Sequence, residues 1–118
     1  MKYGKIYGAA DGRLLLSRVM LAENVLERMR GLLGRPPLAD DQGLLISPCS
    51  SVHTFGMGYP IDLVFLDRAW QIRRIVAALR PLRMAWAPGA HMTLELAPGV
   101  AGALRLEPGQ ALAWQEAP

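Results

Sequence analysis

The chain has 118 residues, of which 52% are hydrophobic and 19% charged, and its net charge is +3. These values are typical of one globular domain that needs neither disulfides nor metals to form a core. No segment approaches the ~18 unbroken apolar residues of a membrane span, and no apolar run follows the basic N-terminus, as a signal peptide would require. A lone cysteine, Cys49, cannot form an internal disulfide. We therefore expect a cytoplasmic domain over residues 1–118 that does not bind membranes.

The N-terminal third predicts one strand followed by one helix. Branched and apolar residues over 13–21 predict the strand. Asn24 and Glu27 have the spacing of a capping box, and Gly34 is placed to end a helix, so the helix is expected over 24–33. Its apolar positions are expected to pack on the sheet: Val25, Leu26, Met29, Leu32 and Leu33.

The rest of the chain predicts short strands separated by turn residues. The strongest signal is Ile61 to Asp67, which Asp67-Arg68-Ala69 can turn back into a hairpin. A single helical turn is expected over 100–104. The expected strands after the helix are 43–46, 52–55, 61–67, 70–79, 93–96 and 110–114. Six or seven short strands and one helix near the N-terminus predict a mostly β (α+β) fold, either a small β-barrel or two packed sheets.

Six motifs occur in a recognisable order, and together they resemble the DUF192 family of uncharacterised bacterial and archaeal proteins over about residues 14–114. The motifs are Arg30-Gly31-Leu32-Leu33-Gly34-Arg35, Gly43-Leu44-Leu45-Ile46, His53-Thr54-Phe55-Gly56-Met57, Ile61 to Asp67, Leu94 to Gly99 and Leu106 to Gln110. The resemblance implies a β-rich fold with its helix near the N-terminus, and no established reaction, cofactor or substrate. Many relatives carry a signal sequence, and another common version of the family has Phe-Trp-Met around positions 54–57 without the histidine.

Cys49 and His53 are the candidates for nucleophilic catalysis, with Asp62 as a possible third member. A thiol attacks as its thiolate, and a nearby imidazole can accept its proton and be oriented by a carboxylate. On a regular strand, Cys49 and His53 would lie about 13 Å apart, but Pro48 and two serines could bend the segment. The alternative is a small buried thiol, a structural histidine and an Asp62 that accepts backbone hydrogen bonds.

Metal ligands are present by type but not by spacing. Cys49, His53, Asp62, His91 and Glu95 could each ligate a metal, yet no two have the close pairing of a zinc motif. We therefore predict no metal site and no cofactor.

The loop from Cys49 to Asp62 is the predicted functional surface, because it places polar, flexible and apolar residues between two strong strand signals. Its expected ligand-binding residues are His53, Thr54 and Met57. The function predicted is a ligand-binding or accessory module for an unknown small molecule or protein, with a Cys/His hydrolase or transferase as the alternative. A weaker alternative is phosphate or nucleic-acid binding through the five arginines of residues 68–83. We expect a monomer and no strong nucleic-acid binding.

Overall fold

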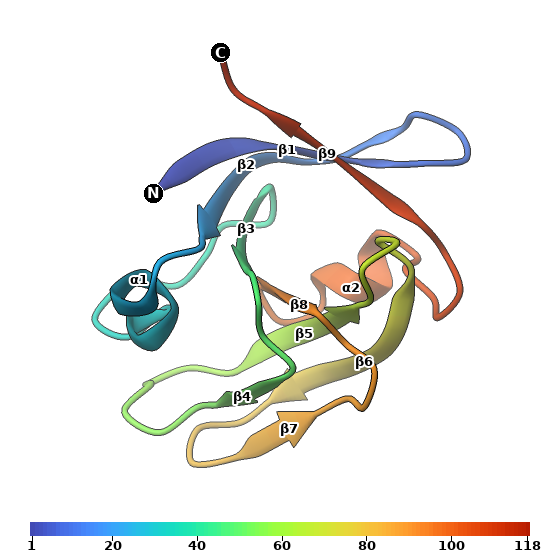
Figure 1. The fold of residues 1–118 in the computed structure, drawn as a ribbon. Helices are drawn as coiled ribbons and strands as arrows, with labels where there is room; N and C mark the ends of the chain where they lie inside the picture. The colour runs from blue at the N-terminus through green and yellow to red at the C-terminus, as the bar shows by residue number, and fades with distance from the viewer.

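A seven-stranded sheet and a two-stranded sheet make up most of the computed structural model, which describes residues 1–118 (Figure 1). The large sheet has the strand order β6-β5-β8-β3-β2-β1-β9, and β4 pairs with β7 in the small one. The strands are β1 (Lys2–Gly8), β2 (Leu14–Ala22), β3 (Gln42–Ile46), β4 (Ser51–His53), β5 (Ile61–Leu66), β6 (Ile72–Leu79), β7 (Met84–Trp86), β8 (Met92–Leu96) and β9 (Leu112–Glu116). Two short helices complete the fold, α1 (Val25–Arg30) and α2 (Val100–Ala103).

Only one strand pair of the large sheet is parallel. β2 and β3 run in the same direction, whereas every other neighbouring pair is antiparallel. A parallel connection needs a crossover, because a tight turn would reverse the chain. Residues 23–41, which include α1, provide that crossover and place α1 beside the sheet (Figure 1).

The two edge strands of the large sheet approach each other at one end. The Ile72 amide donates to the Gln110 carbonyl at 2.8 Å, and the Leu112 amide donates to the Trp70 carbonyl at 2.9 Å. The sheet is therefore strongly curved, but it does not close into a barrel. The predicted mostly β fold of short strands is confirmed, and of the two architectures predicted, the barrel does not form.

Two hydrophobic cores lie on opposite faces of the curved sheet. One contains the inward residues of β1, β2 and β9 together with Val100 and Ala101 of α2. The other lies between β3, β5 and the two-stranded sheet, which contributes Val52 and Ala85, with Ala87 directly after β7. This second core forms the base of the candidate site.

The predicted helix over 24–33 is wrong in length and in packing. Asn24 does cap it, since its side chain accepts from the Glu27 amide at 2.9 Å, but the helix ends at Gly31 with a φ of 51°. Of the five residues expected to pack on the sheet, only Leu32 is buried, and Leu26 and Met29 are 78% and 75% exposed. The reason is that Val52, Ala85 and Ala87 already cover this face of the sheet.

Two strands were not predicted from the sequence. β1 contains two glycines and β7 has only three residues, so neither gives a strong alternating pattern. The strands that were predicted are present with ends shifted by at most two residues, and the helical turn expected over 100–104 is α2. No helix in the structure is long and apolar enough to cross a membrane.

Candidate functional site

Cys49 and His53 line the same small cleft but do not bond to each other. Cys49 precedes β4, and its thiol donates to the Ser51 carbonyl at 3.1 Å. His53 ends β4, is exposed, and stacks on Phe55 with 5.3 Å between ring centroids. The thiol is thus held by backbone, and the imidazole has an aromatic neighbour in place of a thiol or a carboxylate.

Asp62 lies on the opposite face of the sheet from these two residues. Its neighbours Ile61 and Leu63 belong to the core under β4, and side chains alternate along a strand, so Asp62 points into the other core. It is completely buried and accepts from three backbone amides, those of Ala78, Gly99 and Ala101, at 2.8 to 3.0 Å. The structure does not bring Asp62 together with Cys49 and His53.

The other two predicted ligand-binding residues have different surroundings. Thr54 is fully buried, and its hydroxyl donates to the Arg80 carbonyl at 2.7 Å and accepts from the Arg83 amide at 2.9 Å. Thr54 therefore ties two loops together. Met57 is half-buried and does line the cleft beside His53.

The cleft lies between α1, β4 and the loop that follows β4, and it has a volume of about 100 Å³. Gly56 allows the loop to pass closely over the turn after α1, because a Cβ at this residue would lie 2.9 Å from Leu33 and its φ is +83°. Both apolar and polar residues line the cleft. Its lining includes Arg28, Met29, Leu32, Leu33, Ile46, Cys49, Val52, His53, Phe55, Met57 and Glu95.

Glu95 is the residue of this cleft that departs most from ordinary packing. It lies in the middle of β8, between Leu44 of β3 and Leu63 of β5, and only 3% of its surface is exposed. Its carboxyl group makes no hydrogen bond, and the fully buried Oε2 has no partner. A buried carboxylate without a donor is costly, so proteins seldom keep one without a function.

The environment of Glu95 raises its pKa from 4.5 to about 7, because burial disfavours the charged form. Burial, and then the charge of Glu95, also raise the pKa of Tyr59. The Tyr59 hydroxyl nevertheless donates to the Arg35 carbonyl at 3.1 Å and leaves Glu95 without a donor. A carboxyl group that titrates near neutral pH can exchange a proton or accept a hydrogen bond from a ligand.

The remaining candidate residues are dispersed. No three His, Cys, Asp or Glu side chains lie together in a way that could hold a metal ion. Arg73 and Arg74 are consecutive on β6 and so point to opposite sides. Arg73 pairs with Asp67 at 3.1 Å, whereas Arg74 donates to the Trp86 carbonyl. The five arginines of residues 68–83 therefore do not form one continuous face.

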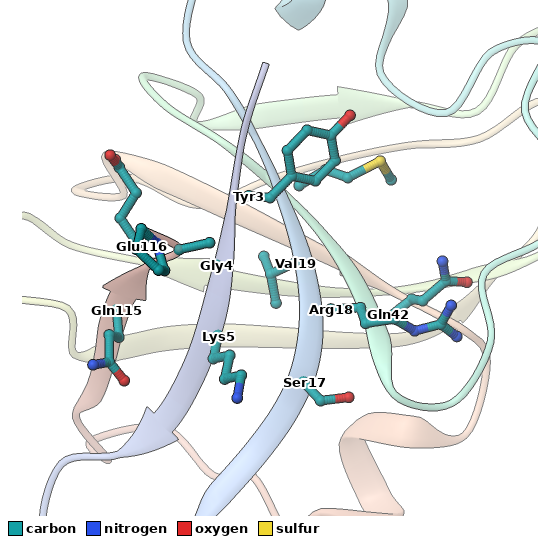
Figure 2. A pocket seen from close by; sticks show the side chains of 12 residues that line it. Tyr3, Gly4, Lys5, Ser17, Arg18, Val19, Gln42, Gln115 and Glu116 are labelled. Atoms are coloured by element: carbon teal, nitrogen blue, oxygen red, sulfur yellow. The ribbon is translucent and has the colours of Figure 1, made fainter.

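A larger hollow of about 440 Å³ lies on the outer side of β1, β2 and β9 (Figure 2). Its polar side chains are exposed or half-buried, and the Arg18 guanidinium is already paired with Asp41 at 2.8 Å. Hydrogen bonds from Arg18 and Ser17 lower the pKa of Asp41 to about 2. This hollow is larger, but it contains no buried polar group without a hydrogen-bond partner. The smaller cleft with Glu95 is therefore the better candidate site.

The fold and the cleft together define a mostly β protein with one curved sheet and a buried, unpaired acid beneath a small surface opening. The model of the DUF192 family, described as "Uncharacterized ACR", matches residues 8–114. The chain therefore belongs to the DUF192 family. No curated protein matches the sequence.

Two solved structures have the same fold. A protein of unknown function from Novosphingobium aromaticivorans DSM 12444 has a TM-score of 0.80 at 24% identity, over 95% of this chain and 84% of that one. A "putative transcription regulator" from Sinorhizobium meliloti 1021 has a TM-score of 0.81 at 25% identity, over 96% of this chain and 92% of that one. Both likenesses concern the fold, and the family assignment rests on the family model.

Sequence reasoning noted Glu95 as a metal ligand by residue type and as an acid between two leucines like Asp62, and it missed Arg28, Met29 and Leu33 as part of the cleft. The available signal was a single acid between Leu94 and Leu96 in an apolar strand. Asp62 gives the same signal, so the sequence could not distinguish the bonded acid from the unpaired one.

Proposed function

We propose that this protein is a ligand-binding module, and that its cleft takes a small group with an N–H or O–H donor, which bonds to Glu95. The observation that carries the proposal is the buried Glu95 carboxyl group without a hydrogen-bond partner at the cleft. A ligand donor would supply the missing bond, and charge-assisted bonds to a carboxylate are among the strongest in proteins.

The cleft volume limits what can enter. At about 100 Å³ it is well below the ~300 Å³ at which drug-sized pockets begin, so it fits a group the size of one side chain. The apolar walls suit a hydrocarbon stem, and the stacked rings of His53 and Phe55 stand at the rim. An alkylamine or a short alcohol combines such a stem with a donor.

The test is titration of the whole protein with three probes of equal length: n-butylamine, n-butanol and n-butyrate. Binding is measured from the changes in the NMR chemical shifts of the backbone amides. Butylamine and butanol are expected to bind in the millimolar range, which corresponds to about 4 kcal/mol. Butyrate offers no donor at neutral pH and is expected not to bind. Butylamine affinity should rise with pH through about 7, because the ionised carboxylate binds an ammonium group best.

Variants in the cleft separate Glu95 from its neighbours. Glu95→Met removes both carboxyl oxygens at similar volume and should abolish amine binding. Cys49→Ser is the matched control, since it alters another residue of the same cleft and should preserve binding. Equal binding of butyrate and butylamine, or unchanged amine binding by Glu95→Met, would refute the proposal.

A further inference from the structure

Most of the exposed large apolar side chains lie in one region of the molecule. Of eleven such residues, only Met1, Tyr3 and Leu14 lie elsewhere. The other eight belong to α1 and the turn after it, to β7, and to the loops that flank the two-stranded sheet, and they are together called the apolar surface. They are Val25, Leu26, Met29, Leu33, Phe55, Leu82, Met84 and Trp86.

The apolar surface is continuous. Met29 and Leu33 share the cleft lining with His53 and Phe55, which connects α1 to the end of β4. His53 is the cross-strand partner of Met84, and Ser51 is the partner of Trp86, so these outward side chains are neighbours on one face. Contiguous exposed apolar areas of this kind mark binding surfaces in soluble proteins.

Unpaired positive charges surround the apolar surface. The side chains of Arg28, Arg30 and Arg83 each donate to a backbone carbonyl, as does Arg74 to Trp86, and none of the four forms a salt bridge with a carboxylate. The sequence from 68 to 94 contains no acidic residue. The acids at the start of α1 are already paired, Glu27 with the terminal amine at 2.8 Å and Glu23 with Lys2 at 3.2 Å.

We propose that the apolar surface docks a segment of a partner protein that presents apolar side chains flanked by aspartate or glutamate. Charge complementarity selects an acidic partner, since the surface offers exposed arginines, its exposed acids are paired, and the unpaired Glu95 is buried. Exposed methionines such as Met29 and Met84 adapt to varied apolar side chains.

A second copy of this chain does not suit this surface. In a twofold pair the same patch meets itself, so the arginines of both copies would come together without carboxylates. The inference does not depend on the proposed ligand. Met29, Leu33 and Phe55 line the cleft, but the other five residues of the apolar surface do not, and the charges around it are unrelated to Glu95.

The test is selection of 12-residue peptides from a random display library on the whole protein, followed by titration of the enriched peptides. Enriched sequences are expected to combine apolar or aromatic residues with Asp or Glu. Their affinity should fall several-fold between about 50 and 300 mM NaCl, since surface charges are screened.

Matched variants assign the binding to the apolar surface. The double variant Leu26→Ser/Trp86→Ser is expected to weaken the selected peptide at least tenfold, as loss of buried anchors does. Tyr3→Ser/Leu14→Ser removes comparable exposed apolar residues elsewhere and should leave affinity unchanged. Glu95→Met should also leave it within twofold, so failure of the amine test does not affect this result.

Three outcomes would overturn the inference. These are selected peptides without acidic enrichment, equal affinity in the Leu26→Ser/Trp86→Ser variant, and tighter binding to vesicles with 30% phosphatidylserine or to a single-stranded 20-mer RNA than to the peptide. Circular dichroism of each variant confirms folding, which exposed substitutions are not expected to disturb.

Discussion

Asp62 and Glu95 are two buried carboxyl groups on adjacent strands, and their surroundings are opposite. Asp62 is paired in register with Leu96, and Glu95 with Leu63, so an offset of one residue places the two acids on opposite faces of one sheet. Asp62 accepts three backbone hydrogen bonds, including two from the start of α2, whereas Glu95 accepts none.

The comparison shows that burial alone does not define the role of an acid. Asp62 accepts from the buried amide of Ala101 and from the part-buried amides of Ala78 and Gly99, so it joins β5, β6 and α2 into one structure. Glu95 satisfies nothing within the protein, and its pKa is raised to about 7. Asp62 therefore stabilises the fold. Glu95 destabilises it, and a role in ligand binding would explain why this acid is present.

The largest expected effect is that of Asp62→Ala. Removing the carboxylate leaves the buried Ala101 amide and the part-buried Ala78 and Gly99 amides without their acceptor, and a buried unpaired amide costs ~1–3 kcal/mol. We expect the free energy of unfolding in urea to fall by ~3–5 kcal/mol. Asp62→Asn keeps one acceptor oxygen and should lower the free energy of unfolding by less. A loss below about 1 kcal/mol for Asp62→Ala would contradict the structural role.

The second effect is the pH dependence that Glu95 confers. Because its pKa is raised in the folded state, the folded protein binds this proton more tightly than the unfolded chain. The associated stability is fully present below pH 4.5 and is lost as the pH rises to about 7. The loss is ~3 kcal/mol at 1.36 kcal/mol per pH unit.

Urea denaturation of wild type and Glu95→Gln at pH 4.5 and pH 8 measures this effect. The difference between the two proteins cancels the other titrating groups, so it isolates Glu95. If the difference in unfolding free energy between wild type and Glu95→Gln were the same at pH 4.5 and pH 8, the Glu95 carboxyl would titrate like an exposed one.

A smaller gain is expected from Glu95→Met at pH 8. Replacing a buried, unpaired carboxylate with an apolar side chain of similar size should raise the unfolding free energy by ~1–3 kcal/mol. At pH 4.5 the acid is protonated and the gain should be smaller. Thermal unfolding at both pH values measures it, and destabilisation at pH 8 would indicate a hidden partner for Glu95.

The smallest expected change in the free energy of unfolding is that of Met29→Ala, at a residue that lines the cleft with Glu95. Met29→Ala should change stability by no more than about 0.5 kcal/mol, because Met29 is 75% exposed. Leu32→Ala is the matched comparison on the same segment. It is 2% exposed and should cost ~2–5 kcal/mol, and equal effects would show that α1 packs differently.

The sequence was sufficient for most of the strands and for the start of the helix. The run from Ile61 to Leu66 and the Asn24 cap are local signals that the structure keeps. The packing of α1 was not predictable, because residues 52, 85 and 87 cover the sheet face in its place, and no local pattern reports a distant competitor.

The sequence by itself determined the β-rich class and the family, since alternation, turn residues and motif order are properties of the chain. Only the tertiary structure decided which acid is satisfied. Asp62 and Glu95 have equivalent sequence surroundings, but the donors that meet Asp62 come from residues 78, 99 and 101. Hydrogen bonds between distant segments depend on strand register, and register is established only when the sheet assembles.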